Sequence, residues 1–299
     1  LRPLEIDGEQ IISYKEAMIQ EKQPQSLIII GAGAIGVEFA HFYNTFGTEV
    51  TLIEALPNIL PNEDVDISKE LEKIFKQRKM NIYTNTMVDR IDKLKTKIKI
   101  YTKNGDTIEA DKALIAIGVK GNIEDIGLEE CGIKIENRWI QVNHSMETSQ
   151  QNIYAIGDVV GPPWLAHVAS AEGITAVEHL AGLNPKPMEY TNIPGCTYCH
   201  PEVASVGLTE KDAQEAGYEI KVGNFPFRGL GKSMSVGDTD GFVKVIYDAK
   251  YGEMLGCHII GAEATNINTE AVIARKLETT YYEVLKTVHP HPTLSEAIM

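Results

Sequence analysis

The feature that most constrains the fold of this chain is a short apolar run that leads directly into a glycine-rich turn. Residues 27–30 are LIII, and GAGAIG follows, with Gly31, Gly33 and Gly36 in the order G-x-G-x-x-G. An apolar run of this length is typical of a parallel strand buried on both faces. Over residues 34–46 apolar side chains then recur at helical spacing. The sequence therefore predicts a strand, a glycine turn and a helix.

Each glycine has a separate role if the turn binds a dinucleotide. Gly31 permits the tight turn, Gly33 lets the backbone approach a pyrophosphate, and Gly36 lets the helix lie close to the strand. The helix N-terminus would stabilise the phosphate charge. The next predicted strand, residues 49–54, ends in Glu54, whose carboxylate would accept hydrogen bonds from the adenosine ribose. That carboxylate repels a 2′-phosphate, so NAD is expected and NADP is disfavoured; the alternative is a plain strand, turn and helix without a ligand.

Strands and helices continue to alternate as far as residue 180, and the pattern changes beyond Pro194. The later part has alternating strands and separate helices, which is typical of an α+β domain. Residues 1–25 are expected to be a connector with at most a short helix over 11–18. The other predicted elements are helices over 66–79, 165–180 and 263–277, a helix from the Thr280/Glu283 capping box, strands over 113–118, 152–158, 202–208 and 242–248, and a hairpin of strands over 93–103 and 107–110.

Charge and composition exclude several classes of function. The chain has 42 acidic and 28 basic side chains and a formal net charge of -14, so we expect no nucleic-acid binding. No apolar run is long enough to cross a bilayer, so we expect no membrane association. Four cysteines in 299 residues are too few for a disulfide scaffold, and a reducing compartment is expected, either the cytoplasm or the mitochondrial matrix. The chain begins at Leu1 without a methionine, and we expect it to be a fragment.

The segment CTYCH, residues 196–200, matches both the haem c attachment pattern and the redox C-x-x-C pattern. Haem attachment implies export, which nothing else in the sequence supports. A redox pair needs a helix N-terminus to acidify its first thiol, whereas EVASVG, just downstream, indicates a strand. Zinc would need four ligands, and no second pair occurs. We interpret Cys196 and Cys199 as ordinary strand cysteines and expect no metal site.

Two further segments carry polar residues in positions suited to a site. Asp158 would lie at the carboxyl end of a parallel strand, where open α/β sheets bind ligands, unless it only turns the chain. Near the end of the chain, residues 289–296 are HPHPTLSE, which hold His291 between two prolines with Glu296 close enough to fold back on it. A carboxylate on one ring nitrogen would leave the other free to accept a proton near neutral pH. Although a lone histidine is usually structural, this arrangement predicts the base half of a His–Glu pair.

Taken in chain order, GAGAIGVE, IYAIGDVVGPPWLAH and HPHPTLSE resemble the flavin-dependent pyridine nucleotide-disulfide oxidoreductases. PGCTYCHPEVASVGLTE and KLETT make the sequence most similar to the members that oxidise dihydrolipoyl groups, and the resemblance covers essentially the whole chain. It implies an α/β fold with a Rossmann-like NAD domain, a partial FAD-domain segment and a C-terminal α+β dimerisation domain. The implied ranges are 1–19 for a connector from the FAD domain, 20–143 for the NAD domain, 144–190 for the returning FAD-domain segment and 191–299 for an interface domain truncated at its C-terminus.

The resemblance also implies roles for individual residues and partners. Asp158 would hold the ribityl chain of FAD, His291 would deprotonate a dithiol bound at the flavin of the other subunit in a homodimer, and Glu296 would orient His291. Electrons would pass from dihydrolipoyl groups through a protein disulfide and FAD to NAD, with lipoyl domains of 2-oxoacid dehydrogenase complexes or of the glycine cleavage system as partners. The resemblance places Gly31, Ala32, Gly33, Ala34, Ile35, Gly36, Val37, Glu38, Glu54, Val88 and Gly118 in the NAD cleft, and Trp164, Leu165, Ala166 and His167 at the flavin.

The sequence also departs from the family pattern. The family's first FAD fingerprint and its reactive cysteine pair, spaced C-x-x-x-x-C, do not occur in this chain. GVKGNIE, which follows the strand over 113–118, lacks an arginine that many relatives carry. We therefore expect the isolated chain to be unable to turn over lipoamide. The alternatives are a related reductase acting on glutathione or mercuric ion, of which the former would favour the NADPH that Glu54 disfavours, and a non-catalytic module that binds NAD and dimerises.

Overall fold

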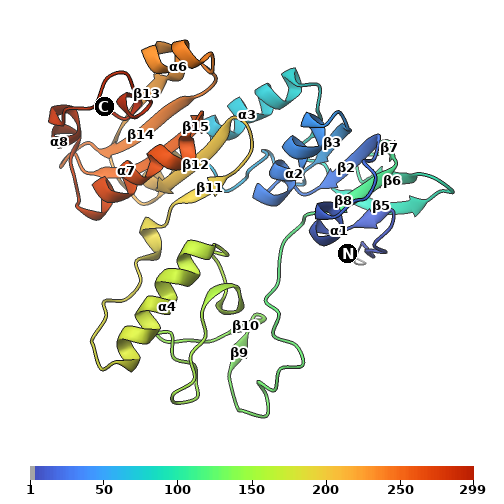
Figure 1. Cartoon of the computed structure of the whole chain (residues 1–299), viewed down its shortest axis with the longest axis horizontal. Helices are drawn as coiled ribbons and strands as arrows, with labels where there is room; N and C mark the ends of the chain where they lie inside the picture. The colour runs from blue at the N-terminus through green and yellow to red at the C-terminus, as the bar shows by residue number, and fades with distance from the viewer. Residues whose placement is uncertain (1–3) are drawn as a thin grey trace. The chain divides into compact units, whose positions relative to one another are not determined.

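The computed structural model describes residues 4–299, which divide into two compact units. Residues up to 117 and residues 194–299 form the larger unit, and residues 118–193 form the smaller unit. Figure 1 shows sheets flanked by helices in the larger unit, whereas the smaller unit is built around one helix, α4 (Ala166–Leu180). The mixed α/β class expected from the sequence is confirmed. The domain boundaries expected after residues 143 and 190 stay a prediction.

A parallel sheet of five strands carries the glycine turn, in the order β1-β8-β2-β3-β4. Its core joins Leu27 and Ile29 of β2 to Val37 of α2 and Leu71 of α3, all fully buried. The predicted succession of strand, turn and helix is therefore confirmed. The bounds are β1 Ile11–Ile12, β2 Ser26–Ile30, β3 Glu49–Ile53, β4 Asn81–Tyr83, β8 Lys112–Ile115, α2 Ala34–Thr45 and α3 Val65–Gln77.

A second, antiparallel sheet of three strands packs beside the first, in the order β5 (Val88–Lys93), β6 (Ile98–Thr102) and β7 (Thr107–Ala110). The hairpin around residues 104–105 is confirmed, but the single strand predicted over 93–103 is wrong. The chain turns where the amide of Leu94 donates to the carbonyl of Lys97, and Leu94 is exposed. Alternation begins only after this turn, where Ile98 and Ile100 are fully buried.

The expected connector, of which residues 1–3 lie outside the described part, has more structure than predicted. The short helix is present as α1 (Tyr14–Met18), which begins at a capping box formed by Ser13 and Glu16. Just before it, β1 pairs with β8 and extends the parallel sheet. The prediction missed this strand because a two-residue strand is too short to show a period in the sequence.

The C-terminal part of the larger unit is an antiparallel sheet of five strands in the order β11-β12-β15-β14-β13. The α+β pattern, the helix after residue 263 and the Thr280/Glu283 capping box are confirmed. Cys196 lies in β11, and Cys199 follows it, buried, as a free thiol. The bounds are β11 Gly195–Thr197, β12 Glu202–Gly207, β13 Ile220–Pro226, β14 Phe242–Asp248, β15 Met254–Gly261, α5 Glu210–Glu215, α6 Gly231–Val236, α7 Ala264–Lys276 and α8 Tyr281–Lys286.

A buried lysine joins the two halves of the larger unit. The ammonium group of Lys244, on β14, lies 2.9 Å from Asp64, 2.7 Å from Asp66 and 2.8 Å from Glu210. Asp64 is also the N-cap of α3. The side chains of Lys244 and Asp64 are each 1% exposed, so neither charge could be solvated by water if its partner were lost. Through this cluster, α3 and the parallel sheet are held to the five-stranded antiparallel sheet that contains β14.

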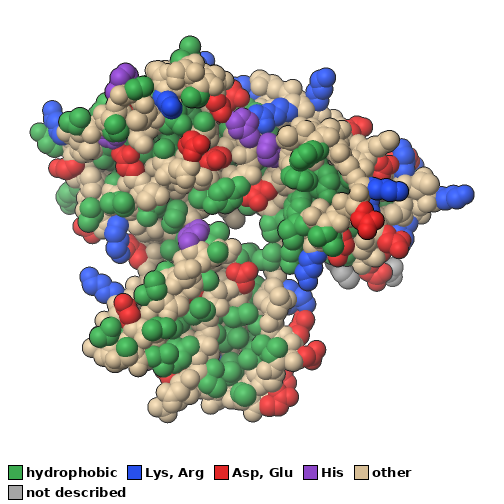
Figure 2. Space-filling view, viewed as in Figure 1, with side chains coloured by type: hydrophobic (Ala, Val, Ile, Leu, Met, Phe, Trp, Pro, Cys, Tyr) green, Lys and Arg blue, Asp and Glu red, His purple; other side chains and the backbone are tan. Residues whose placement is uncertain are grey.

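The smaller unit contains α4, a two-stranded ribbon of β9 (Ile135–Glu136) and β10 (Trp139–Ile140), and a 3₁₀ helix over Gly157–Val160. The strand predicted over 152–158 is wrong. In the described chain that segment makes only an isolated bridge at Tyr154, and Ile153 and Ile156 are each 40% exposed. An apolar run becomes a strand only where a neighbouring strand pairs with it, and no strand of this unit pairs with residues 152–158. Figure 2 shows hydrophobic side chains on the visible face of this unit.

Candidate functional site

Two of the three motif glycines are required by the packing of the larger unit itself. A Cβ atom on Gly31 would lie 2.4 Å from the carbonyl oxygen of Ala116, and φ at Gly31 is +101°. A Cβ atom on Gly36 would lie 1.9 Å from the carbonyl oxygen of Gly31. Any side chain at Gly36 would therefore push α2 away from the turn that follows β2. These two contacts explain the turn and the close helix expected from the sequence.

Gly33 differs, because a Cβ atom there would meet no atom within 4 Å. Its φ of -70° is accessible to any residue, so neither packing nor backbone strain in the chain requires glycine. Gly33 is also the N-cap of α2 and provides no side-chain hydrogen bond to the first turn of that helix. Helix amides left without a cap, beside a position with open space, fit an anionic ligand that approaches the backbone.

Glu54 follows the last residue of β3 and holds the glycine turn in place. One carboxylate oxygen accepts a hydrogen bond from the amide of Ala32 at 2.7 Å, and the other accepts from the amide of Leu56 at 2.9 Å. The residue is 8% exposed. Because each carboxylate oxygen has two lone pairs, both can accept a further hydrogen bond from a hydroxyl group. The expected ribose acceptor therefore lies directly against the expected pyrophosphate turn.

The remaining residues predicted for the NAD cleft have varied surroundings. Ala32, Val37 and Val88 are buried in the larger unit, whereas Ala34 and Ile35 are exposed on the first turn of α2. Glu38 accepts a hydrogen bond from the amide of Tyr198 at 2.8 Å, and burial raises the pKa of its carboxyl. Glu38 therefore contacts the turn between β11 and β12. Gly118, with φ of +133°, is the first residue of the smaller unit.

The residues predicted to approach a flavin lie on one segment of the smaller unit. Asp158 is exposed on the 3₁₀ helix, and Ala166 and His167 are exposed in the first turn of α4. Trp164 is 39% exposed and packs against Trp139, with ring centroids 5.5 Å apart. Leu165 is the N-cap of α4 and gives no side-chain cap, so this helix also begins with amides that a ligand can use. The segment therefore presents the predicted residues to solvent, as a cofactor-binding surface requires.

The predicted His–Glu pair is present in the larger unit. Nδ1 of His291 lies 2.9 Å from Oε1 of Glu296, and the amide of Thr293 donates to Oε2 of Glu296 at 2.8 Å. These two hydrogen bonds lower the pKa of Glu296, the amide of Thr293 more than the ring. The side chain of His291 is 75% exposed, against 20% for Glu296. A carboxylate can only accept, so in the neutral ring the proton lies on Nδ1 and Nε2, on this largely exposed side chain, is the proton acceptor.

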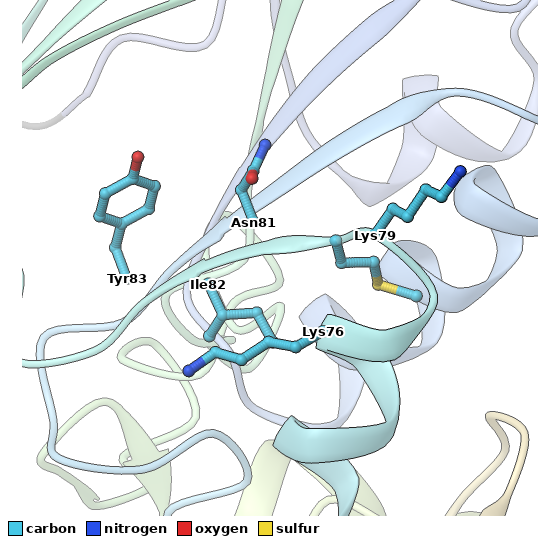
Figure 3. Close-up of a pocket in the computed structure, with 6 residues that line it drawn as sticks. Lys76, Lys79, Asn81, Ile82 and Tyr83 are labelled. Carbon is cyan, nitrogen blue, oxygen red and sulfur yellow. The ribbon is translucent and has the colours of Figure 1, made fainter.

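The pocket beside β4 does not include any of the predicted site residues. A pocket of about 440 Å³ follows edge strand β4 and is lined by Lys76, Lys79, Met80, Asn81, Ile82 and Tyr83. Figure 3 shows the amino groups of Lys76 and Lys79 pointing in different directions, and none of the predicted site residues lines the pocket.

Within residues 4–299, no three His, Cys, Asp or Glu side chains are arranged to hold a metal ion. No helix in the same range is long and apolar enough to span a membrane.

Two models of known protein families match the chain. The model of the pyridine nucleotide-disulphide oxidoreductases matches residues 2–173, and the model of the dimerisation domain of the same family matches residues 193–299. The chain belongs to the pyridine nucleotide-disulphide oxidoreductase family. The resemblance to this family that the sequence motifs suggested is therefore confirmed.

Two curated relatives are both named dihydrolipoyl dehydrogenase. The dihydrolipoyl dehydrogenase of Bacillus subtilis (strain 168) is 48% identical over 300 residues, which cover 99% of this chain and 63% of the relative. The dihydrolipoyl dehydrogenase of Rhizobium etli is 45% identical over 300 residues, with 99% of this chain and 62% of the relative covered. The chain thus spans less than two thirds of the length of these relatives.

Solved structures of the family resemble the chain across both units. LpdA from Mycobacterium tuberculosis matches with a TM-score of 0.92 and 26% identity, covering 100% of this chain and 65% of that protein. The HOCl-induced flavoprotein disulfide reductase RclA from Escherichia coli matches with a TM-score of 0.91 and 26% identity, covering 97% of this chain and 67% of RclA.

Sequence reasoning missed two groups beside the contact between His291 and Glu296. The first is the amide of Thr293, which no side-chain pattern could indicate because it is a backbone donor. The second is Glu270 on α7, whose Oε1 lies 2.7 Å from Nε2 of His289. That contact holds His289, the first histidine of HPHPTLSE, against α7, and its side chain is only 5% exposed. Glu270 lies 19 residues before His289, so no local pattern in the sequence indicated this contact.

Proposed function

We propose that this chain is the NAD-binding and subunit-interface portion of a dihydrolipoyl dehydrogenase. The reaction joins the two sulfurs of a protein-bound dihydrolipoyl group in a disulfide, transfers two electrons and one proton as hydride to NAD, and releases one proton. The observation that carries the proposal is the hydrogen bond of 2.9 Å between His291 and Glu296. The names of the relatives and the open space at Gly33 support it.

In this proposal His291 is the proton acceptor for the dithiol. Glu296 holds the ring proton on Nδ1, so that Nε2 takes the proton of the first thiol and leaves a thiolate, which is the reactive nucleophile. The imidazolium that results is stabilised by the carboxylate, whose lowered pKa keeps it charged. The exposure of His291 suits a base that must reach a large protein-bound substrate, and it supports the proposal that the base serves the neighbouring subunit of a homodimer.

The glycine turn binds the nucleotide in the same proposal. Gly33 and the first turn of α2 would receive the pyrophosphate, and Glu54 would accept the ribose hydroxyl hydrogen bonds and repel a 2′-phosphate. Asp158, Trp164, Leu165, Ala166 and His167 would hold FAD, which when bound supplies electron transfer between a dithiol and NAD. The partners would be lipoyl domains of 2-oxoacid dehydrogenase complexes or of the glycine cleavage system.

The test is an extended protein in which the parts of the Bacillus subtilis relative that lie outside the matched residues are joined to this chain. We expect this protein to reduce NAD with dihydrolipoamide, and His291→Gln to lower turnover by about 10²–10⁴-fold, the usual contribution of a general base. His144→Gln, at an exposed position of the smaller unit, is the matched control and should leave turnover unchanged. Preference for NADPH or for glutathione disulfide would contradict the assignment.

A second candidate is an NAD-binding and dimerising module without catalysis. It is favoured by the cysteines, because Cys131, Cys196, Cys199 and Cys257 include no C-x-x-x-x-C pair. Burial raises the pKa of the Cys199 and Cys257 thiols to about 12, so neither is a thiolate at neutral pH. For the isolated chain this candidate predicts NADH binding without any dithiol oxidation. Titration of NADH into the purified chain tests it, and no binding at millimolar NADH would exclude it.

A further inference from the structure

The orientation of the His291 ring depends on very few contacts. Its side chain is mostly exposed, and within the described chain its hydrogen bond to Glu296 is the one that restrains it. Glu296 in turn lies in a short 3₁₀ turn, Ser295–Ala297, held down by the buried side chains of Leu294, Ala297 and Ile298. The backbone of Glu296 is therefore fixed. What directs its carboxylate toward the ring is the second hydrogen bond, from the amide of Thr293.

That amide is available because the side chain of Thr293, and not its amide, closes the preceding turn. In an ordinary β-turn over residues 290–293, the amide of the fourth residue would donate to the carbonyl of the first. Here the amide of Thr293 donates to Glu296, and the hydroxyl of Thr293 donates to the carbonyl oxygen of Pro290 at 2.8 Å. Pro290 and Pro292 have no amide hydrogen to offer in its place. The hydroxyl thus closes the turn and leaves the amide for the carboxylate.

We propose that Thr293 is a positioning residue for His291: its hydroxyl closes the turn on Pro290 and thereby commits its amide to Glu296, which orients the ring. Without the hydroxyl, the turn can close only by taking the amide from Glu296, or it stays open. Either outcome loosens the carboxylate and, with it, the preference for a proton on Nδ1. The inference deepens the proposed function and takes from it only the role of Nε2 as the proton acceptor.

The test is the tautomer of His291, measured by nitrogen NMR on the chain with ¹⁵N-labelled histidine at a pH where the ring is neutral. Thr293→Val removes the hydroxyl at constant shape, and Thr293→Ser retains it. Since one such hydrogen bond shifts an equilibrium by about fivefold, we expect Thr293→Val to lower the ratio of the Nδ1–H to the Nε2–H tautomer by about that factor. Thr293→Ser should match the wild type.

The matched control is Thr287→Val, because the hydroxyl of Thr287 donates to the carbonyl of Glu283 at the end of α8 and has no contact with His291. It should leave the tautomer ratio unchanged, and His291→Gln assigns the signal. An unchanged ratio in Thr293→Val, with the fold intact by circular dichroism, would overturn the inference. A shifted ratio together with full turnover of His291→Gln in the extended enzyme would instead reject the proposed function and leave the positioning role standing.

Discussion

Replacing Gly33 with alanine separates a role in cofactor binding from a role in folding. The added Cβ meets no atom within 4 Å, and φ of -70° suits alanine. Alanine is a poorer N-cap than glycine by about 0.5–1 kcal/mol, but it restricts the unfolded chain by a similar amount, about 0.4–1 kcal/mol. The free energy of unfolding should therefore change by less than about 1 kcal/mol.

The same methyl group would occupy the space through which a pyrophosphate reaches the amides of α2. A charge-assisted hydrogen bond contributes about 1.5–3 kcal/mol, so the loss of one should weaken NADH binding by about 10–100-fold. Fluorescence titration with NADH and urea denaturation measure the two quantities. Gly36→Ala is the contrasting variant, because its Cβ would lie 1.9 Å from the Gly31 carbonyl oxygen, and it should lose stability as well. Gly33→Ala with wild-type NADH affinity would refute the assignment of this turn to the cofactor.

Three further predictions concern charge. Lys244→Met should lower the free energy of unfolding in urea by about 3–5 kcal/mol by leaving Asp64 buried without its cation, whereas Lys211→Met, from an exposed pair, should lower it by less than about 1 kcal/mol; equal losses would contradict the burial argument. Burial raises the pKa of Glu63, so the stability that its protonated carboxyl provides is complete below pH 4.5 and is lost as the pH rises. At pH 8, Glu63→Gln should therefore be at least as stable as wild type. A less stable variant at that pH would refute this prediction. Burial and the charges of Arg78 and His200 lower the pKa of His41, so the stability that the neutral ring of His41 provides is complete above pH 6.5 and is lost as the pH falls. Between pH 8 and 5.5 the melting temperature of His41→Gln should therefore fall less than that of wild type. Equal falls would contradict this role of His41.

The parts of the fold that local patterns determine were predictable from the sequence. The strand, glycine turn and helix at residues 26–45 follow from hydrophobic periodicity and from positions where only glycine fits. The capping box at Thr280 and the contact of His291 with Glu296 are also local, since their partners lie three and five residues apart. Each of these was found because the residues concerned are neighbours in the chain.

The features that sequence reasoning missed depend on distant partners or on the backbone. The segment over 152–158 has the composition of a strand, but pairing decides strand formation, and its own unit supplies no neighbouring strand. Lys244 looks like a solvated charge in an alternating strand, and only the fold brings Asp64 and Asp66 to it. The amide of Thr293 and the contact of Glu38 with Tyr198 involve backbone donors, which leave no mark on the sequence.

The most direct test of the proposed mechanism uses mixed dimers of the extended protein. One protomer carries His291→Gln, and the other carries serine in place of the reactive cysteines of the added segment. Since a base that serves the neighbouring subunit leaves one complete site in such a dimer, we expect about half of the wild-type dihydrolipoamide turnover, although each variant alone is inactive. A mixed dimer as inactive as its parents would show that base and thiols act within one chain, and full activity of the His291→Gln homodimer would show that His291 is not the base.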